Sequence, residues 1–144
     1  GGYTTQVGKP ISLGRPTKYY RQIFDAAKES YDNIVDQMRP GRSLEDIQSK
    51  GGAPLKESGL SMTQTPLVHG LGIWNEEPRV SIDSIRFDGP CSGKFKLKPG
   101  MTFSVQPNPV SKDRRFGLFL ADTYAVTVNG PKCMMNDPMR LVEI

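Results

Sequence analysis

Apolar positions recur at steps of three and four residues between residues 18 and 39, which is the spacing of one face of an α-helix. Thr17 is a suitable N-cap, and Arg39-Pro40-Gly41 ends the pattern. We therefore expect a helix of about six turns over residues 18–39. Its apolar positions are Tyr20, Ile23, Phe24, Ala27, Tyr31, Ile34, Val35 and Met38.

A second helix is indicated directly afterwards. Ser43 is followed three residues later by Asp46, an arrangement similar to the capping box that starts many helices. Glycine and proline both disfavour a helix interior. We therefore expect this second helix to be short and to be interrupted by Gly51-Gly52-Ala53-Pro54.

After residue 60 the pattern changes to short apolar or alternating segments bounded by Gly, Pro, Asn or Asp. A further segment near the N-terminus alternates in the same way, and its Pro10 favours a sheet edge or a bulge. Helices followed by strands predict one α+β domain with a mostly antiparallel sheet and the helices on one side. The predicted strands are 3–13, 67–74, 79–87, 93–97, 101–106, 116–128 and 139–143.

Composition excludes several classes of protein. Hydrophobic residues make up 36 % of the 144 positions, and no apolar run is long enough to cross a membrane. The net charge of +4 comes from scattered lysines and arginines, which argues against nucleic-acid binding. Cys91 and Cys133 form no paired motif, so we expect two free thiols in a reducing, cytoplasmic compartment.

His69 is the only histidine, so a metal site built on several imidazoles is excluded. A carboxylate-rich metal site with a single histidine stays open, as does a histidine ring that bonds only to backbone at a strand end. Gly70 and Gly72 beside it permit the close approach of another chain or of a ligand. They do not form a dinucleotide-binding motif, because the third glycine and the following helix are missing.

Four segments in order resemble motifs of the pita-bread metallopeptidase family, which includes methionine aminopeptidases, prolidases and the metal-free enzyme creatinase. They are GGYTTQVGKPISLGRP (1–16), HGLGIWNEEP (69–78), LKPGMTFSVQPNPV (97–110) and GLFLADTYAVTVNGPKCM (117–134). The resemblance implies that residues 1–144 are the second half of a pita-bread fold, a curved, mostly antiparallel sheet with helices packed on one face. It also implies that the N-terminal half of the family domain is absent from this chain.

Active members of the family hold two metal ions with two aspartates, one histidine and two glutamates. The resemblance places the histidine at His69 and the second aspartate at Gln6. It places the two glutamates at Gln106 and Ala121, and the first aspartate would lie before Gly1. Asp122 does not replace the ligand lost at Ala121, because neighbouring strand residues point to opposite faces. Only His69 is a competent ligand, and we expect no bound metal or other cofactor.

The segment after His69 supplies further candidates. Asn75 stands where a prolidase-like and lyase-like branch of the family has an aspartate, and Glu76 is retained. Trp74 is placed to wall a pocket or to pack in the core. We therefore name His69 and Glu76 as candidate catalytic residues. Candidate substrate-binding residues are Gln6, Trp74, Asn75 and Gln106.

Several functions remain open at this point. The chain is expected to be a catalytically inactive relative that binds a peptide or small molecule, or that acts as a scaffold or dimerisation surface. A fold retained without any ligand is an alternative. So is a creatinase-like hydrolase that uses His69, and so is a divergent metallopeptidase or lyase that holds Mn, Fe, Co or Zn through Glu77 or Asp122. The expected partners are a second copy of the chain or the missing N-terminal portion.

Overall fold

The structure is a computed structural model, and it describes residues 2, 4–62, 65–72, 78–87 and 95–144. Helix α1 spans Lys18–Gln37 and confirms the predicted long helix. The backbone N–H of Tyr20 donates to the Thr17 hydroxyl at 3.1 Å, which makes Thr17 the N-cap. After the helix, Gly41 adopts a positive φ of 86°, a conformation that glycine accepts without strain.

Helix α2 spans Leu44–Glu57 and begins with the predicted capping box. The expected interruption at Gly51-Gly52-Ala53-Pro54 is wrong, because contacts with α1 satisfy the backbone there. Pro54 has no N–H to donate to the carbonyl of Lys50, but the side chain of Asn33 donates to that carbonyl at 3.4 Å. Ser30 likewise donates to the carbonyl of Gly51 at 2.5 Å. The helix therefore continues for a further turn.

The two glycines of α2 lie where the helices pack against their neighbours. A Cβ atom on Gly51 would overlap the side chain of Ile34, a buried residue of α1. A Cβ on Gly52 would lie 3.2 Å from Cγ1 of Ile82, in the turn that follows a strand. Because these glycines have no side chains, α2 packs closely against its neighbours at both positions. The two glycines that suggest a helix interruption in the sequence therefore allow close packing within a continuous helix.

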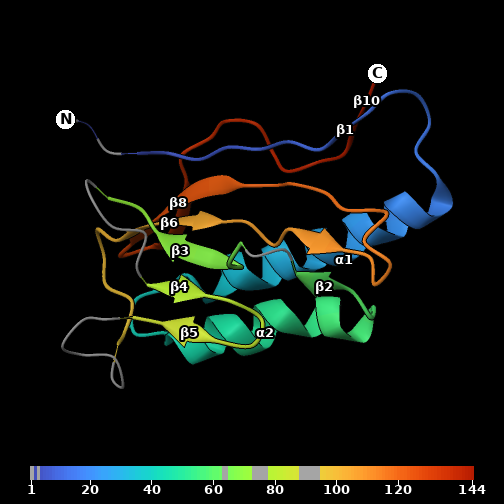
Figure 1. Cartoon of the computed structure of the whole chain (residues 1–144). Helices are drawn as coiled ribbons and strands as arrows, with labels where there is room; N and C mark the ends of the chain where they lie inside the picture. Colours follow the sequence, from blue (N-terminus) through green and yellow to red (C-terminus); the bar gives the residue numbers. More distant parts are fainter. Residues whose placement is uncertain (1, 3, 63–64, 73–77, 88–94) are drawn as a thin grey trace.

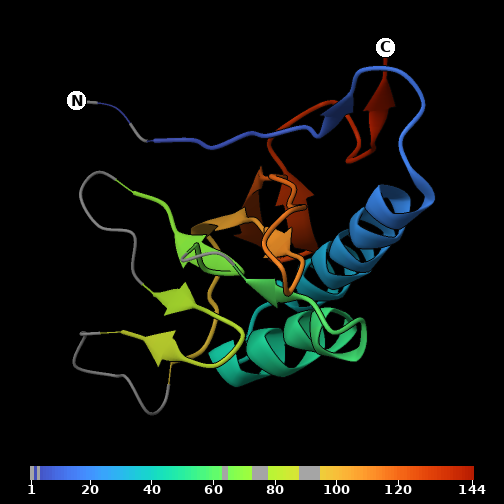
Figure 2. The ribbon, with the colours of Figure 1, turned by 45° about the vertical axis from the view of Figure 1, so that its right-hand side comes forward.

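The central sheet has six strands in the order β5-β4-β3-β6-β8-β9, and every neighbouring pair is antiparallel. Both helices lie on one side of this sheet, and the opposite side faces the viewer (Figure 1). Figure 2 shows the same two layers after rotation. The strands are β3 (Val68–Gly70), β4 (Arg79–Val80), β5 (Ile85–Arg86), β6 (Thr102–Val105), β8 (Asp122–Thr127) and β9 (Gly130–Cys133).

The core fills the space between the sheet and the helices. Ile23, Ile34 and Leu55 from the helices are fully buried together with Val68 and Phe103 from the sheet. The predicted α+β class, with a mostly antiparallel sheet and helices on one face, is confirmed. None of the helices in the described part of the chain is long and apolar enough to span a membrane.

Two small sheets join distant parts of the chain. Strand β1 (Ile11–Ser12) pairs in parallel with β10 (Val142–Glu143), and β2 (Ser61–Met62) pairs antiparallel with β7 (Pro109–Val110). Before β1, Gly8 forms a two-way backbone pair with Ala121. The N-terminal segment thereby lies alongside the chain that leads into β8.

The predicted strands are shorter in the structure than in the pattern. Residues 3–13 contain only β1 and the Gly8 pairing, and residue 3 lies outside the described part. Residues 79–87 form two strands, because Ser81 and Ser84 bond across a turn in the middle. In 93–97 the described residues make a single bridge through Lys96. The segments 67–74, 101–106, 116–128 and 139–143 each contain a strand, whereas β2, β7 and β9 were not expected.

Candidate functional site

The side of the sheet away from the helices carries a polar cluster that we call the site face: Gln6, His69, Ser104, Gln106, Ala121 and Thr123. Strand register places three of these residues in one row, because His69 of β3 is opposite Ser104 of β6, which is opposite Thr123 of β8. Directly opposed residues of antiparallel strands point to the same face. All three are buried.

The N-terminal segment brings Gln6 to this row. The hydroxyl of Thr123 donates to the carbonyl of Gln6 at 3.0 Å and accepts from its N–H at the same distance. The backbone pair between Gly8 and Ala121 fixes the same segment two residues further on, with bonds of 2.8 and 3.0 Å. The N-terminal segment, which is far from β3 and β8 in sequence, therefore lies against the site face.

Hydrogen bonds fix the orientation of the His69 ring. Nδ1 lies 2.9 Å from the carbonyl oxygen of Gly70, which only accepts, so Nδ1 carries a proton. Nε2 points at the side chain of Gln6, with 3.0 Å to Oε1. A cationic ring donates to this oxygen, whereas a neutral ring accepts from the amide nitrogen after the amide turns over. Gln6 therefore remains a hydrogen-bond partner of Nε2 in either charge state of the ring.

Two atoms on the site face have no hydrogen-bond partner among the described residues: Oγ of Ser104 and Oε1 of Gln106. Gln106 is only 2 % exposed and follows Ser104 by two positions, so its side chain lies on the same side of the strand. A buried acceptor without a partner costs free energy, which marks these atoms as places where a ligand or water completes the bonding.

Asp122, the acid next to Ala121 in sequence, points away from the site face. Asp122 is 1 % exposed and lies on the helix side of the sheet, opposite Val105. Its Oδ2 accepts from Lys9 at 3.0 Å and from the Tyr31 hydroxyl at 2.8 Å. This confirms the prediction that Asp122 does not stand in for the ligand missing at Ala121.

The donor set on the site face does not fit a pair of divalent cations. It offers one imidazole, two neutral amides and hydroxyl groups, with a methyl group at Ala121. Two hard cations require carboxylates to balance their charge. Among the described residues no group of three His, Cys, Asp or Glu side chains is placed to hold a metal ion. Trp74, Asn75, Glu76 and Glu77 lie outside the described residues, so their predicted roles stay predictions.

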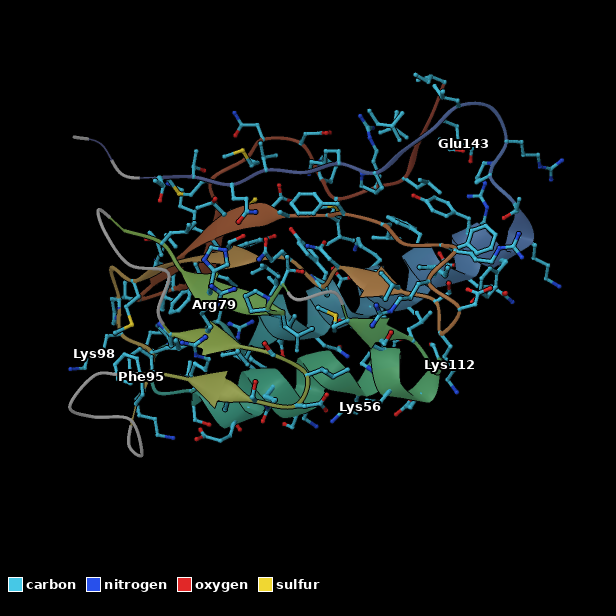
Figure 3. The ribbon with its side chains drawn as sticks, in the orientation of Figure 1. Lys56, Arg79, Phe95, Lys98, Lys112 and Glu143 are labelled. Atoms are coloured by element: carbon cyan, nitrogen blue, oxygen red, sulfur yellow. The ribbon has the colours of Figure 1, made fainter. Side chains whose placement is uncertain are left out.

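Sequence reasoning missed one charged residue of this face. Arg79 of β4 is directly opposite His69, so its side chain projects on the site face. Figure 3 labels Arg79 in front of the sheet, on the side away from the helices. The pairing of β3 with β4 identifies Arg79 as a residue of this face, and the sequence pattern, which predicts one continuous strand over 79–87, does not give that pairing.

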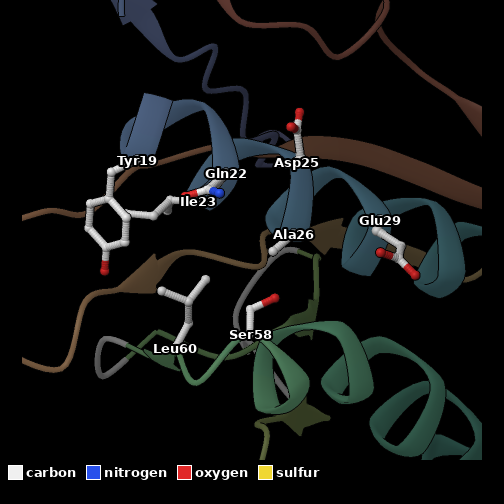
Figure 4. Close-up of a pocket in the computed structure, with 8 residues that line it drawn as sticks. All are labelled: Tyr19, Gln22, Ile23, Asp25, Ala26, Glu29, Ser58 and Leu60. Atoms are coloured by element: carbon white, nitrogen blue, oxygen red, sulfur yellow. The ribbon is translucent and has the colours of Figure 1, made fainter. Parts of the chain in front are cut away.

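A separate hollow lies between α1 and the end of α2 (Figure 4). Its volume is about 460 Å³, and none of its lining residues is a predicted site residue. Tyr19, Ile23 and Leu60 form its apolar part, and Asp25 and Glu29 lie on the α1 side. The hollow is open. None of its lining side chains is held by a hydrogen bond to a second side chain among the described residues, as His69 is held by Gln6.

Comparison with known proteins identifies the family. The sequence profile of metallopeptidase family M24 matches residues 1–128. The chain belongs to this family. A hydrolase/peptidase of Sinorhizobium fredii, described as uncharacterised, is 28 % identical over 144 residues, which cover 99 % of this chain and 34 % of that protein. The Xaa-Pro dipeptidase of Pyrococcus furiosus is 26 % identical over 132 residues, with 90 % of this chain and 35 % of that protein covered.

Solved structures of the family agree with the fold. Dipeptidase PepE from Mycobacterium ulcerans has a TM-score of 0.79 and 25 % identity over 99 % of this chain and 37 % of its own. A prolidase from Thermococcus sibiricus has a TM-score of 0.80 and 22 % identity over 99 % of this chain and 36 % of its own, which shows the shared fold alone. The chain therefore has the pita-bread fold in part and spans about a third of the length of these two curated relatives.

Proposed function

We propose that this chain is a metal-independent member of the metallopeptidase family, catalytically inactive as a metallopeptidase, that binds a peptide or small molecule on the site face. One observation carries the proposal. Of the positions that the resemblance assigns to metal ligands, Gln6 bonds to His69, and Gln6, Gln106 and Ala121 are all uncharged.

Metal content tests this proposal directly. Elemental analysis of protein purified without added metal is expected to find no stoichiometric Mn, Fe, Co or Zn, and titration with each ion is expected to give no tight binding. One or two tightly held ions per chain would contradict the proposal. Replacement of His69 by Ala is expected to leave metal content unchanged.

A gain-of-binding variant provides the positive control. The triple variant Gln6→Asp, Gln106→Glu and Ala121→Glu restores three carboxylates around His69. It is expected to bind at least one divalent ion more tightly than the unmodified chain, since charge is what the face lacks. Circular dichroism is needed to confirm that the triple variant is folded, because Gln106 and Ala121 are buried.

A metal-free hydrolase of the creatinase kind is the second candidate, and one contact favours it. The bond from Nδ1 of His69 to the carbonyl of Gly70 orients the ring so that Nε2 faces Gln6, and a substrate that displaces the Gln6 amide would meet Nε2 for proton transfer. Hydrolysis of dipeptides or of small amidines that persists in excess EDTA, and that His69→Gln abolishes, would support this candidate. Activity that depends on added metal would exclude it.

We further propose association with a second copy of the chain or with an N-terminal portion of the protein, in the cytoplasm. Support comes from apolar side chains exposed along the N-terminal segment and β10, namely Val7, Ile11, Leu13 and Ile144. The single described cysteine, Cys133, is a free thiol, as expected in a reducing compartment. Light scattering would detect a dimer, and Leu13→Ser with Ile144→Ser is expected to weaken it.

A further inference from the structure

Another hollow, which we call the β8 pocket, lies on the helix side of the sheet, away from the site face. Its volume is about 400 Å³, within the range of about 300–1,000 Å³ that is usual for small-molecule sites. Helix α1, strands β8 and β9 and the loop after β9 supply its walls. The lining residues that bear on its chemistry are Lys28, Tyr31, Asp122, Tyr124, Cys133 and Met135.

A chain of hydrogen bonds with a fixed direction runs along the most buried wall of the β8 pocket. The Tyr31 hydroxyl donates its proton to Oδ2 of the Asp122 carboxylate at 2.8 Å. Tyr124 must therefore donate in the 2.8 Å bond between the two tyrosine hydroxyls, because each hydroxyl has a single proton. Neither tyrosine has a proton left for a ligand, whereas the Tyr124 oxygen can still accept one.

Asp122 has one oxygen without a partner. Oδ2 accepts from Lys9 and Tyr31, but Oδ1 has no hydrogen-bond partner among the described residues. The side chain is only 1 % exposed, and it shares with Tyr124 the face of β8 that lines the pocket. A buried carboxylate oxygen that accepts no bond costs free energy, so a donor that reaches it is stabilised there. The most buried wall therefore suits an occupant that donates a hydrogen bond.

The charges around the β8 pocket are already balanced. Each carboxylate that lines it has a basic partner, and the pairs are Lys9–Asp122, Lys28–Asp32 and Arg140–Asp137. An ammonium group at Oδ1 of Asp122 would lie beside the ammonium of Lys9, and like charges repel. A neutral donor forms the same bond without that repulsion. Charge balance therefore favours a neutral hydroxyl over a cation.

The remaining walls offer apolar and polarizable contacts. Cys133 of β9 is directly opposite Tyr124, so its thiol lies on the same face of the sheet and lines the pocket. Met135 and Met139 line it from the loop after β9, and Met139 is buried. Thioether groups pack well against aromatic rings and adapt to the shape of a ligand. An apolar, ring-like body therefore fits beside the hydroxyl.

We propose that the β8 pocket binds a small neutral alcohol or phenol with an apolar body. The ligand hydroxyl donates to Oδ1 of Asp122, and the apolar part packs among Tyr124, Met135 and Met139. The pocket is on the opposite side of the sheet from His69. Its occupation is therefore independent of what the site face binds, and each proposal can fail without the other.

Alkylation of Cys133 by iodoacetamide measures occupation of the pocket, because this half-buried thiol lines it. Mass spectrometry of peptides separates Cys133 from Cys91, and ligand-observed NMR gives the affinities without using the thiol. Three probes of similar shape are benzyl alcohol, ethylbenzene and benzylammonium, which differ in the group that they present to Asp122.

Benzyl alcohol is expected to slow the alkylation of Cys133. It is expected to bind at least about ten times more tightly than ethylbenzene, which has no donor, and also more tightly than benzylammonium. Equal binding of benzyl alcohol and ethylbenzene, tighter binding of benzylammonium, or no binding of any probe would overturn the proposal.

Variants locate the bound alcohol. Tyr124→Phe removes an acceptor beside Asp122 and is expected to weaken benzyl alcohol by about threefold to tenfold. Met135→Trp fills the pocket from a half-buried position and is expected to abolish binding. Tyr19→Phe removes a hydroxyl from the hollow in Figure 4 and is expected to leave binding unchanged. If Met135→Trp does not fold, the isosteric Tyr124→Phe still decides: unchanged binding there would place the alcohol elsewhere.

Discussion

The two faces of the central sheet use polar side chains in opposite ways. On the helix side, Asp122 is buried and its Oδ2 is held by both Lys9 and Tyr31. On the site face the neighbouring residue is Ala121, and the buried polar groups around it are neutral amides and hydroxyls. An acid lies where it supports the fold, whereas the adjacent position, to which the resemblance assigns a metal ligand, has none. The comparison distinguishes an acid that stabilises the fold, Asp122, from a position, Ala121, where an acid would serve only to bind metal.

The helix-side acid is expected to give the largest effect on stability. Asp122→Ala leaves the mostly buried Lys9 ammonium without its carboxylate partner, with only the carbonyl of Asp137, among the described residues, to accept from it at 2.8 Å. The change is expected to lower the free energy of unfolding by about 3 kcal/mol. The control is Asp32→Ala, whose partner Lys28 lies 2.6 Å away in an exposed pair on α1. That change is expected to cost less than about 0.5 kcal/mol. Urea titration measures both, and equal costs would remove the distinction between a structural acid and a surface acid.

The glycines of α2 give the next largest effect. Gly51→Ala places a methyl group against buried Ile34 and is expected to cost about 2 kcal/mol, despite the better helix propensity of alanine. Gly52→Ala meets Ile82 at 3.2 Å in a half-buried turn that can shift. It is expected to be close to neutral. Thermal or urea unfolding of the pair checks this, and a neutral Gly51→Ala would show that the helices are not closely packed there.

On the site face, by contrast, a substitution is expected to raise the free energy of unfolding. Gln106→Met removes a buried acceptor without a described partner and is expected to stabilise the chain by about 1 kcal/mol while weakening ligand binding. Asn108→Leu is the matched control, because that buried amide accepts the N–H of Leu120 at 2.8 Å. Its loss is expected to cost about 1 kcal/mol. Denaturant midpoints measure both, and destabilisation by Gln106→Met would mean that the amide is satisfied in the protein.

The smallest expected effect is a loss of stability at alkaline pH, caused by two tyrosines on the helix side of the sheet. Burial raises the pKa of Tyr124 from 10.0 to about 12, and burial together with its hydrogen bond to Tyr124 raises that of Tyr31 further. The unfolded chain therefore loses these protons first, so the stability they contribute is present below about pH 10 and is lost as pH rises. The loss from Tyr124 is expected to stay below about 1 kcal/mol between about pH 9 and 10.5. Tyr124→Phe should reduce this loss of stability, as measured by urea titrations at the two pH values. An unchanged loss would mean that Tyr124 is not the group responsible.

The parts of the fold that follow from local patterns were predicted well. The apolar spacing that gave α1 needs only one buried stripe, and the capping box at Ser43 is a bond between neighbours in sequence. The end of α2 was not predictable in this way. It depends on Ser30 and Asn33 of another helix satisfying the carbonyls near Gly51 and Pro54. Strand lengths failed for the same reason, since a strand extends only as far as its partner does.

By itself, the sequence determined the family, the α+β class and the loss of acids at three of the positions that the resemblance assigns to metals. It also determined the orientation of Asp122, because alternation along a strand is a local property. Only the tertiary structure decided that Gln6 contacts His69 and that Arg79 and Arg86 share a row with it. These contacts depend on strand register and on the path of the N-terminal segment, which are set by pairing between distant residues.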